Sequence, residues 1–424
     1  MSARENGGRK NLVILSLTLI VVMLGFGMVI PIIPYYMEVM GAGGAELGML
    51  VASYAVMRLI FGPIWGGLSD RVGRKPVLMI GMLGYGIAML GFGLATELWM
   101  LFLFRILSGI LSSATSPTTL AYVSDSTSEK DRGGGMGTLG AAVGLGTIVG
   151  PGLGGWLAGD TLSLQALSLP FFVAAGLSFI TLVLIGLFLP ESLPAEARQS
   201  RPVGSKGFQP SQLWQALSCP QGRPIGILLG MAFLIAYAST AFFGIFGLYA
   251  YQKFEYTPQQ AGMVLMLVGF VSVVAQGGLT GPFTRRWGEA RLIQAASLAT
   301  VVGFIAITLS FSDVTLLLSI GFFTLATALM APAVMALTSK RSTLEQGLTM
   351  GICNSFMSLG RIVGPGGSGF LFDANMEYPL YAGALVTLLG FLAALAWLAP
   401  ERPAAGLEAG ANETEVSPVP QQQP

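Results

Sequence analysis

The sequence contains no histidine, only two cysteines and few charged residues. Without an imidazole side chain the protein cannot build a histidine-based catalytic triad, an imidazole metal site or an imidazole proton relay. Cys219 and Cys353 lie far apart and have the spacing of neither a metal site nor a disulfide framework. The net charge of +1 gives no indication of a nucleic-acid partner. We therefore expect neither an enzyme nor a protein that holds a metal ion or a cofactor.

Long apolar runs dominate the chain instead. Hydrophobic residues make up 53% of its 424 residues and the mean hydropathy is +0.71, which is typical of a membrane protein. A helix of about twenty apolar residues crosses a hydrocarbon core about 30 Å thick. The first run is too long for the core of a cleavable signal peptide and no small-residue cleavage site follows it. Twelve membrane helices are predicted, at 11–37, 46–68, 76–95, 98–122, 134–158, 168–189, 225–251, 258–283, 291–311, 314–338, 346–371 and 379–399.

The basic residues are distributed unevenly over the predicted loops. Eighteen of the 22 lie in the two termini or in loops on the side of the N-terminus, and only Lys253 lies in a loop on the other side. The positive-inside rule then places both termini in the cytoplasm and the protein, as a multi-pass protein, in the cytoplasmic (plasma or inner) membrane. All 21 acidic residues lie in loops, tails or helix ends. The middle of the predicted membrane region therefore has no carboxylate.

The predicted helices form two groups of six around a polar linker. We expect a cytoplasmic N-terminus at 1–10, helical bundles at 11–189 and 225–399, a cytoplasmic linker at 190–224 and a disordered cytoplasmic tail at 400–424. The two halves also echo one another. "GGLSDRVGRK" at 66–75 is matched by "GGLTGPFTRRWGEAR" at 277–291, and "GPGLGGWL" at 150–157 by "GPGGSGFL" at 364–371, at offsets of 211 and 214 residues. The expected fold class is an all-α integral membrane protein of two pseudo-symmetric six-helix bundles, with a site at their interface.

Three motifs resemble those of a known family. "GGLSDRVGRK" resembles the signature loop between helices 2 and 3 of the major facilitator superfamily, "LFRILSG" at 103–109 its fourth-helix motif, and "GTIVGPGLGG" at 146–155 its fifth-helix antiporter motif. The resemblance covers roughly residues 11–400 and is closest to the twelve-helix drug:proton antiporters, which include tetracycline and fluoroquinolone exporters. It implies a secondary transporter that works by rocker-switch alternating access.

The signature loop has a physical explanation. A tight cytoplasmic turn requires glycine, here Gly67 and Gly73, and its cations Arg71, Arg74 and Lys75 fix the local topology because they cannot cross the membrane. The resemblance further implies a gating role. Asp70 should lie at the N-terminal end of a helix in the other half, and Arg74 should pair with Asp125. The alternative is that these charges only fix the orientation.

Small residues of the antiporter motif and of its echo are expected to let helices approach closely, and Pro151 to bend its helix. Tight packing alone explains the glycines equally well. The predicted packing positions are Gly146, Gly150, Pro151, Gly154, Gly155, Gly364 and Pro365.

The sequence departs from the family pattern at the proton-binding acids. Antiporters of this group commonly carry a membrane-embedded acid, whereas Val22, Phe243 and Ala328 stand here at about the corresponding places. Proton translocation needs a titratable group, so this departure leaves two kinds of coupling open. One is proton-coupled antiport, and the other is uniport or organic-anion transport.

Three arginines fall inside predicted helices: Arg58, Arg105 and Arg361. Each costs roughly 2.5 to 3.5 kcal/mol at the bilayer centre, so each must find an acceptor or face water. We hypothesise that Arg58 and Arg361 face each other across the two halves and bind an anionic or strongly hydrogen-bonding substrate. Arg105, by resemblance, influences coupling. The alternative is that all three bind backbone carbonyls near prolines.

Aromatic, methionine and amide side chains of helices 1, 2, 7 and 11 are candidates to line a substrate cavity, because these helices line it in the superfamily. Most such side chains in a membrane helix simply face lipid, which is the alternative for each of them. The candidates beside the two arginines are Phe26, Tyr54, Met57, Phe243, Phe246 and Asn354.

The sequence thus predicts a secondary transporter that exports a small organic compound or drug. Its expected partners are that small molecule, membrane lipids and, if coupling is to the proton gradient, protons, and we expect a monomer. A uniporter or organic-anion carrier is the alternative within transport. A sensor that retained the fold but lost transport is the alternative outside it.

Overall fold

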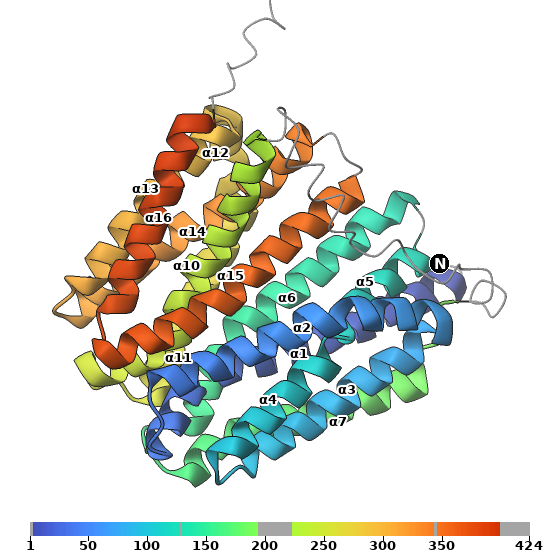
Figure 1. The fold of residues 1–424 in the computed structure, drawn as a ribbon. Coiled ribbons are helices and arrows are strands. Elements are labelled where there is room, and N and C mark those ends of the chain that lie inside the picture. The colour runs from blue at the N-terminus through green and yellow to red at the C-terminus, as the bar shows by residue number, and fades with distance from the viewer. Residues whose placement is uncertain (1–2, 128, 194–222, 343–345, 399–424) are drawn as a thin grey trace, which may run out of the picture.

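A computed structural model describes residues 3–127, 129–193, 223–342 and 346–398, and these residues form helices and no strand. The first group of helices (Figure 1) comprises α1 (Ala3–Val39), α2 (Gly44–Val72), α3 (Arg74–Gly93), α4 (Leu98–Ser112), α5 (Thr115–Ser126), α6 (Glu129–Ala158) and α7 (Leu164–Phe188). The second group comprises α10 (Arg223–Phe254), α11 (Pro258–Val274), the π-helix η2 (Ala275–Leu279), α12 (Thr280–Trp287), α13 (Glu289–Thr308), α14 (Asp313–Arg341), α15 (Gln346–Ala374) and α16 (Tyr378–Trp397).

Eleven described spans are long and apolar enough to cross a membrane, and they match eleven of the twelve predicted helices. Two of them are composite: α4 and α5 together form Leu98–Ser126, and α11, η2 and α12 form Pro258–Trp287. The twelfth, α15, has 29 residues but falls outside this set. Its glycines, serines, Asn354 and Arg361 lower its hydropathy. The all-helical membrane fold is therefore confirmed.

The two signature loops contain equivalent glycine turns. Gly73 joins α2 to α3 with φ of 115°, and Gly288 joins α12 to α13 with φ of 75°. Residues with a Cβ rarely adopt such angles, whereas glycine adopts them readily. The two positions are 215 residues apart, close to the offsets of 211 and 214 residues in the sequence repeat. The tight turns expected from the sequence are thus present in both groups.

Five helix pairs join the first group to the second, chiefly α2 with α15 and α6 with α11, and also α1 with α10, α1 with α11 and α2 with α10. The closest approaches are between small residues at one end of these helices. A Cβ atom placed on Gly48 or Gly369 would overlap backbone atoms of Pro365 or Gly44, respectively. A Cβ atom on Gly155 would lie 2.6 Å from the carbonyl oxygen of Pro258 in α11. Only residues without bulk permit these contacts.

We call this end, which carries residues 40–43, 159–163, 255–257 and 375–377, the sealed end. The opposite end, which carries the loops at Gly73 and Gly288, is the basic end. The described hydrogen bonds between the two groups are five in number and all lie at the sealed end. The basic end has ion pairs within each group instead, Arg74 with Asp125 and Lys340 with Glu289.

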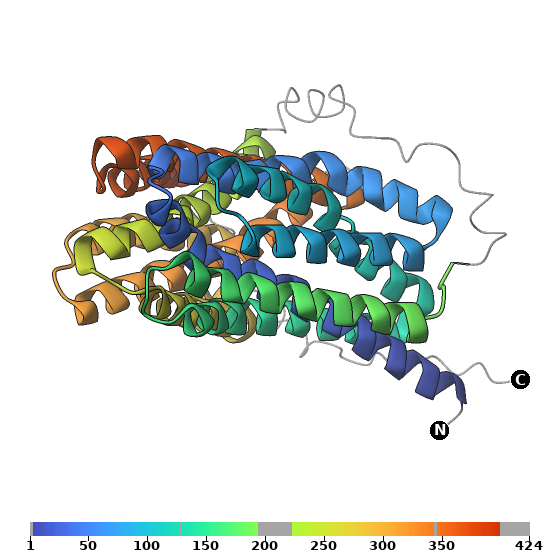
Figure 2. The same ribbon diagram turned by 90° about the horizontal axis from the view of Figure 1, so that it is seen from below.

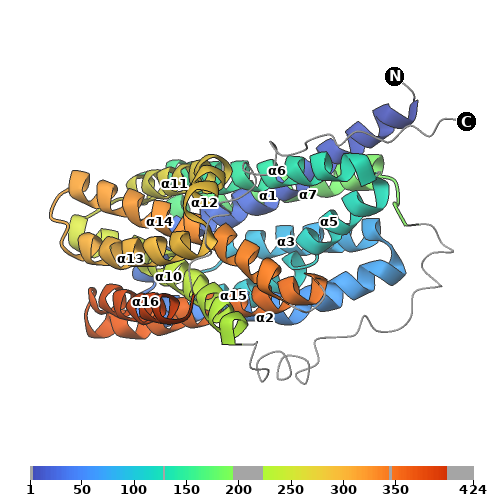
Figure 3. The same cartoon turned by 90° about the horizontal axis from the view of Figure 1, so that it is seen from above.

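The hydrophobic core divides in the same way. One large cluster of buried side chains includes Tyr35 and Phe171 of the first group together with Phe242 and Tyr249 of the second. Toward the basic end the core separates into a cluster in the second group and another in the first. Figure 1 shows α2 and α15 side by side at one end and diverging toward the end that carries the N-terminus, and Figures 2 and 3 show the helices of both groups running along the same long direction of the molecule.

Three details differ from the sequence-based expectations. Helix α1 begins at Ala3, eight residues before the predicted apolar span. The predicted fourth helix is interrupted at Ser113 and Ala114, and the predicted eighth contains the π-helical turn η2 at Gly277 and Gly278. These interruptions follow from small residues and prolines, which apolar periodicity alone does not resolve. Most of the predicted linker and the tail at 400–424 lie outside the described residues.

Candidate functional site

Arg58 and Arg361 lie on the two helices that join the groups at the sealed end. The side chain of Ala52 in α2 lies 3.9 Å from the Cβ position of Gly366 in α15. Toward the basic end, Arg58 follows six residues after Ala52 and Arg361 precedes Gly366 by five, which are rises of about 9 and 7.5 Å. The two arginines therefore lie at the same depth, just where the helices diverge.

The electrostatics of Arg361 indicate an internal cavity. Its side chain is exposed, yet surrounding protein desolvates its charge, and the charge of Arg58 repels it. A side chain that is both accessible and enclosed lines a cleft rather than the outer surface. Asn354, seven residues earlier on α15, is also exposed. The structure thus brings Arg58 and Arg361 to one cleft between the groups that opens toward the basic end, and Asn354 lies about two turns farther toward that end on α15.

A polar stripe connects Arg58 with Arg105 inside the first group. Arg58 Nη2 donates to Ser116 Oγ at 3.3 Å, and the hydroxyls of Tyr54 and Ser112 are 3.2 Å apart. The guanidinium of Arg105 lies 4.7 Å from the ring centroid of Tyr54, a cation–π contact. Arg105 is only 3% exposed, and its Nε has no hydrogen-bond partner among the described residues.

Ser108, Ser112 and Ser116 were not among the candidate residues, although the sequence contained a signal for them. They follow Arg105 at intervals of three, four and four residues, so they share one helical face with it. The interruption between α4 and α5 preserves this face. Polar residues repeated at helical spacing inside an apolar helix are therefore the signal from which the stripe was predictable.

The aromatic candidates divide into two sets. Phe26 of α1 lies 5.6 Å from Tyr54 between ring centroids, and Met57 packs on Gly109 of α4, so these residues flank the polar stripe. Phe243 is half-buried, while Phe246 is fully buried and packs against Phe242, 5.3 Å between centroids. Phe246 belongs to the core at the sealed end and is not accessible from the cleft in this state.

The gating candidates gather at the basic end of the first group. Arg74, 4% exposed, pairs with Asp70 at 2.7 Å and with Asp125 at 2.9 Å, so the expected Arg74–Asp125 pair is confirmed. Asp70 forms its ion pair with Arg74 within its own half, and the apolar cores of the two groups are separate at this end. Glu191 accepts hydrogen bonds from the backbone N–H of Arg74 and Lys75 at the start of α3. Arg71 and Gly67 are exposed.

A carboxylate of the second group caps a helix of the first at the sealed end. Asp373 Oδ1 accepts from the backbone N–H of Gly44 at 2.6 Å and Oδ2 from that of Ala45 at 2.9 Å, which are the first two residues of α2. Such a carboxylate satisfies unpaired donors and interacts favourably with the positive end of the helix. Glu46 caps the same helix from within, through Gly43 N–H at 3.0 Å.

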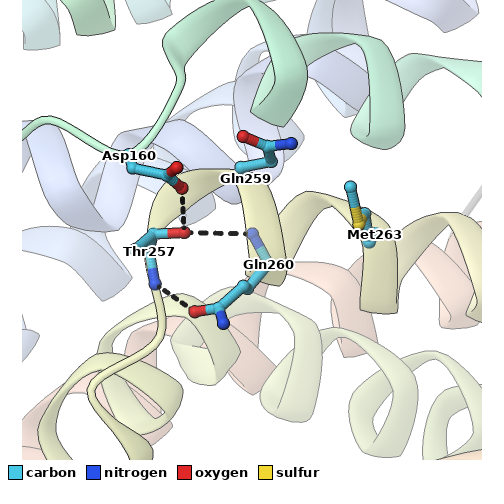
Figure 4. A pocket seen from close by; sticks show the side chains of 5 residues that line it. All are labelled: Asp160, Thr257, Gln259, Gln260 and Met263. Atoms are coloured by element: carbon cyan, nitrogen blue, oxygen red, sulfur yellow. Dashed lines mark hydrogen bonds between the residues drawn. The ribbon is translucent and has the colours of Figure 1, made fainter.

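Two further contacts close the sealed end. Tyr35 Oη donates to the carbonyl oxygen of Tyr256 at 2.8 Å, and Thr257 Oγ1 donates to Asp160 Oδ1 at 2.8 Å. Figure 4 shows Asp160, Thr257 and Gln260 around an open pocket at this contact. Burial and the hydrogen bond to Asp313 raise the pKa of Tyr256 to about 12, so this hydroxyl stays protonated near neutral pH.

The predicted packing residues all occupy close helix contacts. Cβ atoms on Gly146, Gly150 and Gly154 of α6 would lie 2.7 Å from atoms of α1, and Gly155 and Pro151 contact α11. A Cβ on Gly364 would lie 2.7 Å from Thr240 Oγ1 in α10, while Pro365 contacts Gly48 and Gly244. The α6 residues thus serve both the first bundle and the contact between the groups.

The described helices contain neither an acidic residue at mid-depth nor a cluster of metal-ligating side chains. Val22 and Ala328, which stand at about the places where the family resemblance leads us to expect an embedded acid, are buried apolar residues. No three His, Cys, Asp or Glu side chains gather as metal ligands in the described ranges.

Comparison with known proteins gives concordant matches. The sequence matches the family model described as Major Facilitator Superfamily over residues 15–325 and 228–423. It is 32% identical over 408 residues to multidrug resistance protein 2 of Bacillus subtilis (strain 168), covering 96% of this chain and 100% of the relative. It is 25% identical over 395 residues to quinolone resistance protein NorA of Staphylococcus aureus (strain MSSA476), covering 91% and 96%. The fold resembles that of a bacterial homologue of the human lysosomal transporter Spinster, solved in an inward-facing, unoccupied conformation, with a TM-score of 0.78, 16% identity and coverage of 95% and 100%.

Proposed function

Because the chain belongs to the major facilitator superfamily, and is a membrane transporter rather than an enzyme, we propose that it exports small organic compounds, drugs among them, by alternating access. The names of its relatives support this substrate class, since they are a multidrug resistance protein and a quinolone resistance protein. The observation that carries the proposal is the cleft at Arg58 and Arg361, which opens toward one end of the molecule and is sealed at the other.

The basic end faces the cytoplasm in this proposal. The concentration of arginine and lysine in the loops and termini of that end supports the orientation. The described state is then inward-facing, the state in which an exporter takes its substrate from the cytoplasm. We further propose that the two bundles before and after the linker move as units and that the monomer is the working unit.

Substrates meet Arg58, Arg361 and Asn354 in the cleft, with Phe26, Tyr54 and Met57 as apolar neighbours. Guanidinium groups form paired hydrogen bonds with carboxylates, so the proposed preference is for aromatic compounds that bear a carboxylate. Phe243 and Phe246 become available only if closure of the basic end rearranges the sealed-end core. Gly67, Gly73, Asp70, Arg71, Arg74 and Asp125 have the proposed gating role.

Coupling does not use an embedded carboxylate or histidine in this proposal. Histidine is absent, and the described helices have no acid at mid-depth. Proton coupling would therefore require a loop or end carboxylate, while Arg105 influences coupling through the polar stripe. Organic-anion transport without proton coupling is the second candidate, which the two cleft arginines favour because neither has a carboxylate partner among the described residues.

Reconstitution tests the proposed function. Purified protein in proteoliposomes should accelerate the efflux of a fluoroquinolone, and the Arg58→Gln and Arg361→Gln variants should raise the substrate concentration for half-maximal rate. Arg285→Gln, a change at an exposed residue of α12, serves as the control. Efflux no faster than from protein-free liposomes, for fluoroquinolones and for cationic drugs alike, would refute drug export.

A further inference from the structure

The two cleft arginines form a pair of like charges that belong to the two different groups of helices. Arg58 belongs to α2 and Arg361 to α15, and both lie about one and a half turns beyond the contact between these helices at Ala52 and Gly366. The charge of Arg58 already acts repulsively on Arg361 in the described state. Figure 1 shows that α2 and α15 diverge toward the basic end.

No described side chain neutralises either charge. Arg58 bonds only the neutral hydroxyl of Ser116, at 3.3 Å. The ion pairs of the described residues involve Arg74, Lys253 and Lys340 instead. A guanidinium does not lose its proton in proteins, so a change of pH cannot discharge the pair. A ligand is the remaining source of compensating negative charge.

Closing the basic end brings the α2 and α15 segments beyond Ala52 and Gly366 together. Repulsion between two unit charges grows as their separation falls and as water leaves the space between them. An anion between the two guanidinium groups turns the repulsion across the cleft into attraction, and it can accept paired hydrogen bonds from both guanidinium groups. The empty cleft therefore resists closure, and an anionic ligand promotes it.

Resting on the proposed function, we propose that Arg58 and Arg361 make each change between inward- and outward-facing states dependent on a bound anion. The empty carrier must pass through the same closed geometry on its return. The return step then also needs an anion, so the protein exchanges one organic anion for another across the membrane. In this scheme the counter-transported anion occupies the place that a proton has in a carrier with an embedded acid.

The conformational test is double electron–electron resonance on the full chain in lipid. Spin labels go to Gly134→Cys on α6 and Arg286→Cys on α12, exposed positions of the two groups at the basic end, after replacement of Cys219 and Cys353. The probe is benzoate at millimolar concentration, compared with benzyltrimethylammonium at equal chloride. Benzoate should raise the closed population by about tenfold or more, and benzyltrimethylammonium should not.

Charge variants separate this inference from general ligand binding. The Arg58→Gln/Arg361→Gln double variant should close without benzoate and should not respond to it, whereas Arg361→Lys should keep the response and Arg285→Gln should behave as the unaltered protein. An unaltered apo distance distribution in the double variant, or an equal benzoate response in it, would overturn the inference.

A transport measurement distinguishes failure of the inference from failure of the proposed function. Labelled benzoate should leave proteoliposomes much faster when unlabelled benzoate is present on the other side. Drug efflux that runs equally well without any anion on the opposite side would leave export standing and would exclude obligatory anion exchange.

Discussion

Replacing Asp373 with asparagine should shift the protein away from the sealed state. The carboxylate accepts two backbone hydrogen bonds from the start of α2, at 2.6 and 2.9 Å, and these bonds join the two halves. A hydrogen bond to a charged group contributes about 1.5 to 3 kcal/mol, and a charge at a helix N-terminus adds about 0.3 to 1. Asparagine keeps one accepting oxygen and loses the charge. Because Asp373 is exposed, solvent screening reduces the loss to about 2 kcal/mol, or about thirtyfold in the ratio of sealed to open states.

The assay uses spin labels at Leu162→Cys and Phe311→Cys, which lie in loops of the two halves at the sealed end and are 39% and 85% exposed. Asp373→Asn should move most of the short-distance population to longer distances. Glu46→Gln is the matched control, because Glu46 caps the same helix from within the first half. It should lower the unfolding temperature without moving the distances.

Two results would refute this reasoning. One is an unchanged distance distribution in Asp373→Asn, which would mean that the small-residue contacts alone hold the sealed end. The other is an equal shift in Glu46→Gln, which would mean that the integrity of the helix start matters rather than the bond between the halves.

Three further substitutions test other parts of the structure. Gly369→Val should prevent the sealed end from closing, because the added carbon overlaps Gly44, and cross-linking between the halves at that end should disappear while the unfolding temperature changes little. Arg74→Gln should lower the free energy of unfolding by about 3 kcal/mol, as measured by denaturation in detergent. This value is at the low end for breaking a buried ion pair because the partners Asp70 and Asp125 are partly exposed. Arg105→Met should change the free energy of unfolding by no more than about 1 kcal/mol, because the buried guanidinium lacks a hydrogen-bond partner at Nε. The same variant should reduce transport. A large loss of stability would contradict this account of the site.

Much of the fold was predictable because the membrane leaves few solutions. Apolar runs of the required length located the helices, and the paired "GGL" and "GPG" motifs indicated the repeat. Hydropathy underestimated only α15, because a helix that lines a polar cleft is less apolar than one that faces lipid.

The contacts across the sealed end were not predictable. Asp373 accepts a hydrogen bond from a backbone N–H, and Asp160 accepts one from a hydroxyl, each from a residue far away in the sequence. Such partners leave no pattern in the sequence. Phe246 illustrates a second limit. Helix α10 is apolar on most faces, so its periodicity could not distinguish the core from the cleft, and the structure places Phe246 in the core.

The helices α2 and α15 connect the cleft to the seal mechanically. Each is a single helix of 29 residues, about 43 Å long, and the two touch from Gly44 and Gly369 to Ala52 and Gly366. A ligand that draws Arg58 and Arg361 together acts on one side of this contact, and Asp373 acts on the other. Because packed helices transmit strain with little deformation, closing the basic end requires the Asp373 bonds to break. The strength of that cap therefore contributes to the binding free energy that an anion must supply, together with the other three hydrogen bonds between the halves, the glycine contacts and the shared apolar core at the sealed end.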